Sequence, residues 1–108
     1  MFIARVVGSV WSSVKWPQLE GLKLLSVQPY DLSDLTQKLQ EAQNTPSCTD
    51  LVVCADVLGA GVGEDVVVAY GHAARVALEE HLHQGDSPNI PVDAAIVAIV
   101  DGVDVRAD

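Results

Sequence analysis

Two segments of this 108-residue chain restrict its fold more than any others: a glycine-rich corner and a run that is apolar throughout. The corner, residues 56–64, contains three glycines and lies between the apolar runs 51–57 and 65–70, which predict strands. The second segment, 94–100, is a strand apolar on both faces with an aspartate near each end. Together they predict a small closed β structure, part of whose surface is covered by something else.

The remaining apolar runs predict two more strands and two short helices. Residues 2–14 are rich in Val, Ile and Trp, and Gly8 interrupts them in a way that is typical of a bend or bulge. The run 22–28 stops at Pro29, which cannot donate to a sheet ladder. Apolar residues recur at helical spacing in two segments (Leu32, Leu35, Leu39 and Ala42; Ala74, Ala77, Leu78 and Leu82). We therefore expect a mainly β fold, a small five-stranded barrel with two short helices, in a single domain spanning 1–108.

The corner and the first helix carry more detailed expectations. Glycines at 59, 61 and 63 should supply positive φ and allow another backbone to approach closely, and the strands on either side should form a hairpin or a barrel turn. The first helix should begin after Asp31, a candidate N-cap, and its apolar stripe should face the core while the helix covers one barrel mouth.

Charge and composition exclude several classes of partner. Fifteen acidic residues against six basic ones give a formal charge of −9, which repels nucleic-acid phosphates and anionic lipids. The longest apolar run is far shorter than the ~20 residues that cross a bilayer, and the N-terminus enters a strand pattern without the features of a signal peptide. Cys48 and Cys54 are too few for a disulfide framework, so we expect free thiols in a reducing cytoplasm.

No motif predicts a catalytic, cofactor or metal site. The glycine corner departs from the spacing of a phosphate-binding loop, and the following element is predicted to be a strand and begins with acidic residues. The three histidines, at 72, 81 and 83, lack the spacing of a helical metal site. No serine lies in a nucleophile elbow.

Three aspartates flank predicted strands, at 56, 93 and 101. Paired carboxylates are conceivable there, but an aspartate in such a place more often caps a turn or pairs with a base such as Arg5 or Arg75.

Five ordered blocks of the chain, 4–8, 19–29, 56–64, 73–75 and 91–101, resemble the motifs of the bacterial microcompartment vertex family. These are the pentameric shell proteins of carboxysomes and of ethanolamine, propanediol and related metabolosomes. The resemblance implies a barrel similar to an oligonucleotide/oligosaccharide-binding fold, assembled as a cyclic homopentamer with a narrow axial opening. It also implies a place in the shell of a microcompartment in the bacterial cytoplasm, with hexameric shell proteins as further partners.

A cyclic pentamer needs two unlike, complementary flanks on each subunit. The corner would allow close backbone approach, and the doubly apolar strand offers more apolar surface than one barrel interior needs. We therefore expect nine residues to lie at the subunit interface or near the axial pore: Gly59, Ala60, Gly61, Val62, Gly63, Glu64, Asp93, Ala94 and Ala95.

Two segments are longer than the family pattern implies, 32–49 and 79–89, and a tail follows at 102–108. The longer segments either adapt the protein to one shell or are neutral surface elaborations. Two other functions stay open: a barrel that binds a small ligand or single-stranded nucleic acid, and an enzyme that uses His72 or the aspartates.

Overall fold

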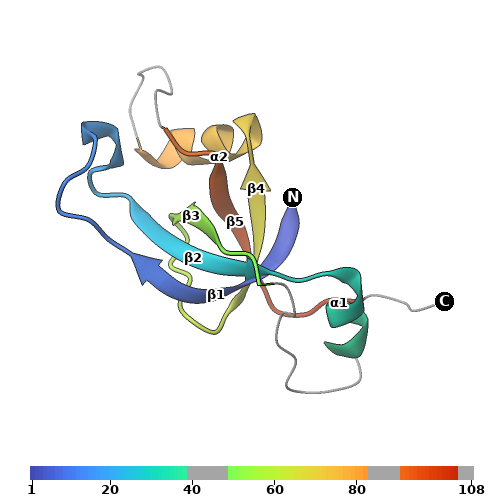
Figure 1. Ribbon diagram of the computed structural model, residues 1–108. Helices are drawn as coiled ribbons and strands as arrows, with labels where there is room; N and C mark the ends of the chain where they lie inside the picture. Colours follow the sequence, from blue (N-terminus) through green and yellow to red (C-terminus); the bar gives the residue numbers. More distant parts are fainter. Residues whose placement is uncertain (39–48, 83–90, 105–108) are drawn as a thin grey trace.

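The computed structural model describes residues 1–38, 49–82 and 91–104 (Figure 1). Within these residues, five strands and two α-helices follow one another, with a short 3₁₀ turn, η1 (Pro17–Leu19), after the first strand. The elements are β1 (Phe2–Val10), β2 (Lys23–Pro29), α1 (Leu32–Lys38), β3 (Val52–Asp56), β4 (Asp65–Tyr70), α2 (His72–Leu82) and β5 (Ala94–Val100).

The five strands close into a barrel in the order β1-β2-β3-β5-β4, which confirms the predicted fold class. Neighbouring strands are antiparallel except for β3 and β5, which pair in parallel through Ala55 with Ala95 and Asp56 with Ile96. β5 thus lies between β3 and β4, so the hairpin alternative for the corner was wrong. Turn residues determine where a chain reverses direction, but they do not determine which strand becomes the ladder neighbour.

β1 ends at Val10, four residues before the predicted end, and its predicted irregularity is present at Gly8. The register between β1 and β2 shifts between Val6 and Gly8. A Cβ at Gly8 would lie 2.9 Å from the hydroxyl oxygen of Ser26 on β2, so this position tolerates a side chain only if Ser26 moves.

The first helix starts as predicted, but Leu32, the first residue of its predicted apolar stripe, does not face the core, whereas Leu35 is half-buried. Asp31 caps it: the Asp34 backbone N–H donates to the Asp31 carboxylate at 2.9 Å, and the Asp31 N–H donates back to the Asp34 carboxylate at 3.1 Å. This reciprocal cap turns Asp34 inward, where it is buried, and leaves Leu32 68% exposed. The predicted stripe residues Leu39 and Ala42 lie outside the described residues.

Most of the core fills the barrel interior. Its members come from all five strands and the corner: Ala4, Val6, Leu25, Val27, Cys54, Ala60, Val66, Val68, Ala94 and Ile96. Because side chains occupy the interior, the barrel encloses a packed core.

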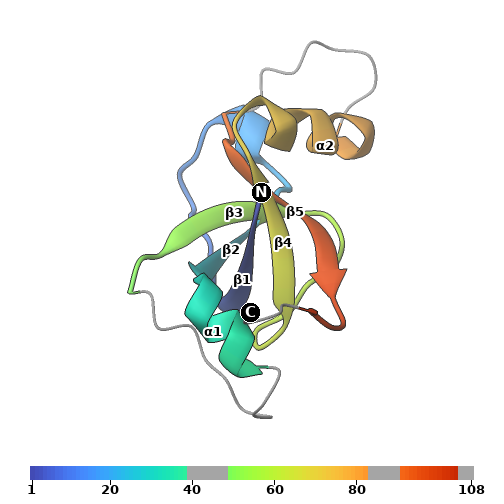
Figure 2. The same ribbon diagram turned by 90° about the vertical axis from the view of Figure 1, so that its right-hand side faces the viewer.

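A second, smaller cluster joins α2 to the outside of the barrel. It consists of Ala55, Ala74, Leu78 and Ala95, and α2 therefore lies against the outer face of the first half of β5, beside Ala55 of β3. Small alanines let the helix approach the sheet closely. The two helices lie at opposite ends of the barrel (Figures 1 and 2).

Candidate subunit interface

One buried carboxylate holds the first half of the glycine corner. Asp56 accepts hydrogen bonds from the backbone N–H groups of Leu58 at 3.0 Å and Ala60 at 2.9 Å. Its side chain is completely buried, and Lys23 lies above it with Nζ 3.3 Å from the carboxylate. The same ammonium donates to the Ala60 carbonyl at 2.8 Å. Asp56 therefore caps a turn, as expected, and its basic partner is Lys23 on β2.

The second half of the corner is bound to β1. The N–H of Gly63 donates to the Val6 carbonyl, and the N–H of Val6 donates to the Glu64 carbonyl, both at 2.9 Å. The Glu64 carboxylate accepts from the Gly61 N–H at 2.8 Å. These amides already have acceptors within the chain, so the corner does not present the row of free N–H groups with which a phosphate-binding loop holds an anion.

Positive φ in the corner falls on Gly59 (87°) and Gly63 (94°), whereas Gly61 does not adopt it. The expectation for Gly61 was therefore wrong. A Cβ on Gly61 would meet the Glu64 carboxylate at 3.7 Å, an ordinary contact, and one on Gly63 would meet nothing within 4 Å. The pattern of glycines alone could not distinguish these positions, because positive φ depends on how Asp56 and Val6 anchor the two ends.

We expect Gly63→Val to destabilise the folded subunit by about 1–3 kcal/mol, because a β-branched residue resists positive φ. Gly61→Val should shift the urea midpoint much less, since its backbone is unstrained and space is available. Urea unfolding of both variants at one protein concentration tests this. Equal midpoints would contradict the assignment of strain to residue 63.

The structure separates the nine candidate interface residues into two groups. The corner leads into Asp65, which pairs with Val100 at one end of β5, whereas Ala94 pairs with Tyr70 at the other end. Asp93 therefore lies away from the corner, where its carbonyl accepts from the Gly71 N–H at 2.7 Å.

Burial separates the candidates further. The side chains of Ala60, Ala94 and Ala95 are buried within the subunit, and Ala95 lies beneath α2. They cannot offer side-chain surface to a second chain. Val62 is 66% exposed, and Glu64 and Asp93 are also exposed.

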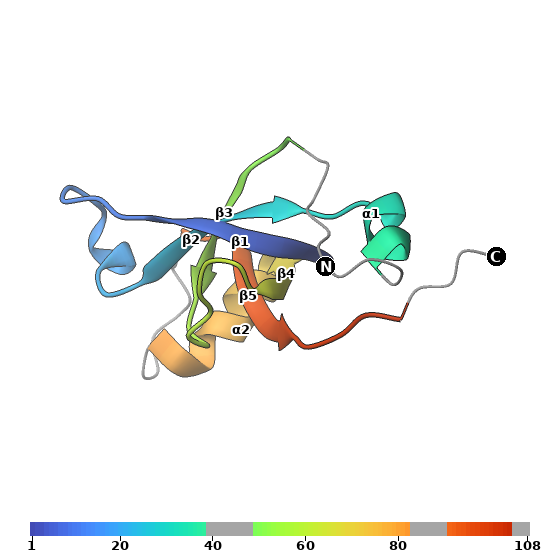
Figure 3. The same cartoon turned by 90° about the horizontal axis from the view of Figure 1, so that it is seen from below.

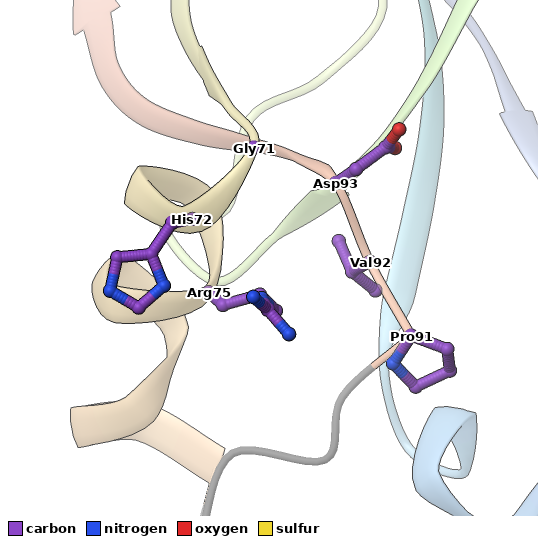
Figure 4. Close-up of a pocket in the computed structure, with 6 residues that line it drawn as sticks. All are labelled: Gly71, His72, Arg75, Pro91, Val92 and Asp93. Atoms are coloured by element: carbon purple, nitrogen blue, oxygen red, sulfur yellow. The ribbon is translucent and has the colours of Figure 1, made fainter.

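A pocket of about 520 Å³ opens beside Asp93 (Figure 4). His72 and Arg75 from the first turn of α2 line one side, and Pro91 and Val92 line the other. Among the described residues, no group of three or more His, Cys, Asp or Glu side chains is placed to hold a metal ion. The side chains of His81 and His83 lie outside the described part of the structure.

A polar cluster that sequence reasoning missed ties β1, β4 and the start of α1 together. Asp65 accepts from the Arg5 guanidinium at 3.1 Å and from the Tyr30 hydroxyl at 2.8 Å. Arg5 also lies 5.7 Å from the centre of the Tyr30 ring. Burial raises the pKa of Tyr30; Arg5 opposes that rise and Asp34 adds to it. Arg5 and Asp65 are direct partners in the β1–β4 register, so this register was the signal that could have revealed the pair.

Cys54 is buried in the barrel, with its thiol 3.7 Å from the Leu25 carbonyl oxygen. Burial, together with the nearby Asp56 carboxylate, raises the pKa of this thiol from 9.0 to about 12. Because the folded protein binds this thiol proton more tightly than the unfolded chain does, the proton stabilises the fold. This stabilisation is fully present below about pH 9 and is lost as the pH rises toward about 12.

We therefore expect Cys54 to resist iodoacetamide at pH 8 in the native protein, because the thiolate is the reactive form. Peptide mass spectrometry should find it unlabelled under conditions that label it fully in urea. Rapid native labelling would show that the thiol is accessible and ionised.

Fold and site together define a small closed-barrel protein whose glycine corner is a structural turn. A family model described as ethanolamine utilisation protein EutN/carboxysome matches residues 1–101. The chain belongs to this family.

Individual relatives are similar over nearly the whole chain. The carboxysome shell vertex protein CcmL of Synechococcus elongatus is 42% identical over 106 residues, covering 98% of this chain and 89% of that protein. The bacterial microcompartment shell vertex protein PduN of Salmonella typhimurium is 40% identical over 101 residues, covering 94% and 96%. The solved GrpN pentameric microcompartment shell protein from Rhodospirillum rubrum matches with a TM-score of 0.73 and 31% identity, covering 98% of this chain and all of that one.

Proposed function

We propose that this chain is the structural subunit of a cyclic pentamer that caps the five-fold vertices of a bacterial microcompartment shell. The observation that carries the proposal is the match to the GrpN pentameric shell protein, which extends over 98% of this chain. The vertex proteins CcmL and PduN, at 42% and 40% identity, support the same role. The protein would act in the cytoplasm, beside the hexameric proteins that form the facets.

Geometry explains why such a subunit is needed. A flat hexagonal layer cannot close, so a polyhedral shell needs five-fold units at its corners, and a head-to-tail interface supplies them if its rotation closes after five copies. Each subunit must then present two unlike surfaces. The exposed part of the glycine corner, with Val62 and Glu64, and the region of Asp93 lie near different ends of β5, and we assign them to interface or pore-proximal positions.

The site geometry favours an architectural role over catalysis or ligand binding. Side chains fill the barrel interior, and the amides of the corner are bound within the chain. The pocket beside Asp93 combines an exposed imidazole with a guanidinium and a carboxylate, but its lining residues include no Ser, Cys or Thr nucleophile. No helix in the described part of the chain is long and apolar enough to span a membrane.

The mass of the purified protein in solution tests this proposal, measured by native mass spectrometry and by light scattering. We expect a pentamer. Co-expression with hexameric shell proteins should then give closed particles by electron microscopy, whereas the hexamers alone should give sheets, tubes or open shells. A protein that stays monomeric at micromolar concentration would overturn the proposal.

A further inference from the structure

The connection between β1 and β2 projects beyond the barrel (Figures 1 and 3). It carries large apolar side chains that are exposed. We call residues 10–22 the arm. Trp11 is 84% exposed, Val14 89% and Trp16 65%. Sequence reasoning assigned part of this segment to a strand and expected no role for it.

The arm is folded rather than merely extended. Backbone N–H groups of Leu19 and Leu22 donate to the carbonyls of Trp16 and Leu19, at 2.9 and 3.1 Å, and Lys15 Nζ donates to the Ser12 carbonyl. A hollow of about 200 Å³ lies against the base of the arm. Trp11, Lys15 and Leu19 are among its lining residues. A surface that is already ordered loses little conformational entropy when a partner covers it.

The exposed area is too large to ignore. A tryptophan buries about 150–250 Å² when it is covered, so these three side chains offer on the order of 400 Å² of apolar surface. That is about half of the ~800 Å² that each partner contributes to a standard interface. An apolar patch of about 300–600 Å² is often functional, and aromatic residues are enriched at the centres of interfaces.

Charge indicates the partner. Residues 1–19 contain Arg5 and Lys15 but no acidic residue, whereas all 15 acidic residues lie from Glu20 onward. The arm as a whole is neutral, because Glu20 balances Lys15, but its apolar part, residues 11–16, carries Lys15 as its one charged residue. A second copy of this chain, with a net charge of −9, offers acidic surroundings that fit the positive charge of Lys15.

We propose that the arm of each subunit packs Trp11, Val14 and Trp16 against the neighbouring copy in the ring. The inference rests on the proposed function, because it assigns the patch to the subunit contact within the pentamer. Contact with a flat shell tile is the alternative that the test separates. If the arm packs within the pentamer, the tryptophans are covered in the isolated pentamer, before any hexameric shell protein is added.

Tryptophan fluorescence provides the first test, since Trp11 and Trp16 are the two tryptophans of the chain. At concentrations where the mass is that of a pentamer, emission should lie at short wavelength and resist acrylamide quenching. Dilution to monomer should shift it to long wavelength. Trp11→Phe and Trp16→Phe leave one reporter each and keep an aromatic ring in the arm.

A pentamer whose tryptophans remain fully accessible to acrylamide would overturn this inference and leave the proposed function standing. A blue shift that occurs only when hexameric shell proteins are added would also overturn it, in favour of the tile contact. A chain that is monomeric at every concentration would overturn the proposed function itself.

The second test is the pair Trp11→Ser with Val14→Ser. We expect this double variant to raise the dissociation constant of the ring at least about tenfold, because central aromatic anchors dominate interface energies. Leu51→Ser, an exposed leucine ahead of β3, is the matched control and should leave the mass unchanged. Circular dichroism establishes that each barrel is folded, and an intact ring in the folded double variant would contradict the proposal.

Discussion

Replacing Leu78 by alanine is expected to destabilise the protein by about 2–5 kcal/mol, the largest effect of a single truncation among the described side chains of α2. Leu78 is completely buried between α2 and the small residues Ala55 and Ala95 of the sheet. Its removal leaves a cavity that alanines cannot fill. An 11-residue helix is marginal in water without tertiary packing, so helical circular dichroism should fall along with stability.

Val76→Ala is the matched control, because Val76 lies on the same helix and is 48% exposed. It should change the free energy of unfolding by no more than about 0.5 kcal/mol. Both variants should be unfolded in urea at the same protein concentration, since assembly would add to the apparent stability. Equal midpoints would show that α2 does not pack on the barrel through Leu78.

Replacing Asp56 by alanine is the second large effect. Two backbone N–H groups, on Leu58 and Ala60, would lose their charged acceptor, and Ala60 is buried. Unsatisfied donors of this kind cost about 1–3 kcal/mol each, so we expect the two together to cost about 2–6 kcal/mol. Lys23 can turn its half-exposed ammonium to water and adds little to that loss.

Two further variants make the Asp56 experiment specific. Asp56→Asn keeps one carbonyl oxygen and should recover part of the lost stability. Asp101→Ala removes an exposed carboxylate just beyond β5 and should leave the urea midpoint nearly unchanged. If Asp56→Ala behaves like Asp101→Ala, the carboxylate does not hold the corner. If Asp56→Ala keeps its urea midpoint but no longer assembles, Asp56 acts at the subunit contact instead.

The two predictions concern two structures that flank β5: the glycine corner, held by Asp56, and the helix α2, held by Leu78. Asp56, which pairs with Ile96, holds the start of the corner, and the backbone of Val6 holds its end. α2 covers the outer face of the first half of β5. The apolar second face of β5 was read from the sequence as surplus surface for another subunit. Its first half is buried within the chain instead, because Ala95 is small enough for α2 to lie against it.

This correction shows why β5 was easy to find and hard to interpret. An apolar run bounded by aspartates predicts a strand buried on both faces. Residues 94–100 form a strand as expected, but only Ala94, Ala95 and Ile96 are buried within the subunit. Periodicity carries no information about what covers each face. A helix from the same chain and a neighbouring subunit both leave the same pattern.

The arm was missed for a related reason. Trp11 and Val14 continue the apolar composition of β1, so composition alone extends the strand to residue 14. The ladder with β2 ends where Val10 pairs with Leu24, and beyond that pair the chain folds into the η1 turn. These residues are exposed in the folded chain, which composition does not reveal. Their exposure makes them a candidate contact surface rather than a continuation of the strand.

Local patterning and ordered motifs predicted the closed five-stranded barrel, the positions of both helices, the cap at Asp31 and the family. The three-dimensional structure was needed to show that β5 separates β3 from β4, that Asp56 pairs with Lys23, that Arg5 pairs with Asp65, and which corner glycines hold positive φ. These features join residues distant in the chain. Long-range pairing is selected by the packing of the whole barrel, and no local spacing encodes it.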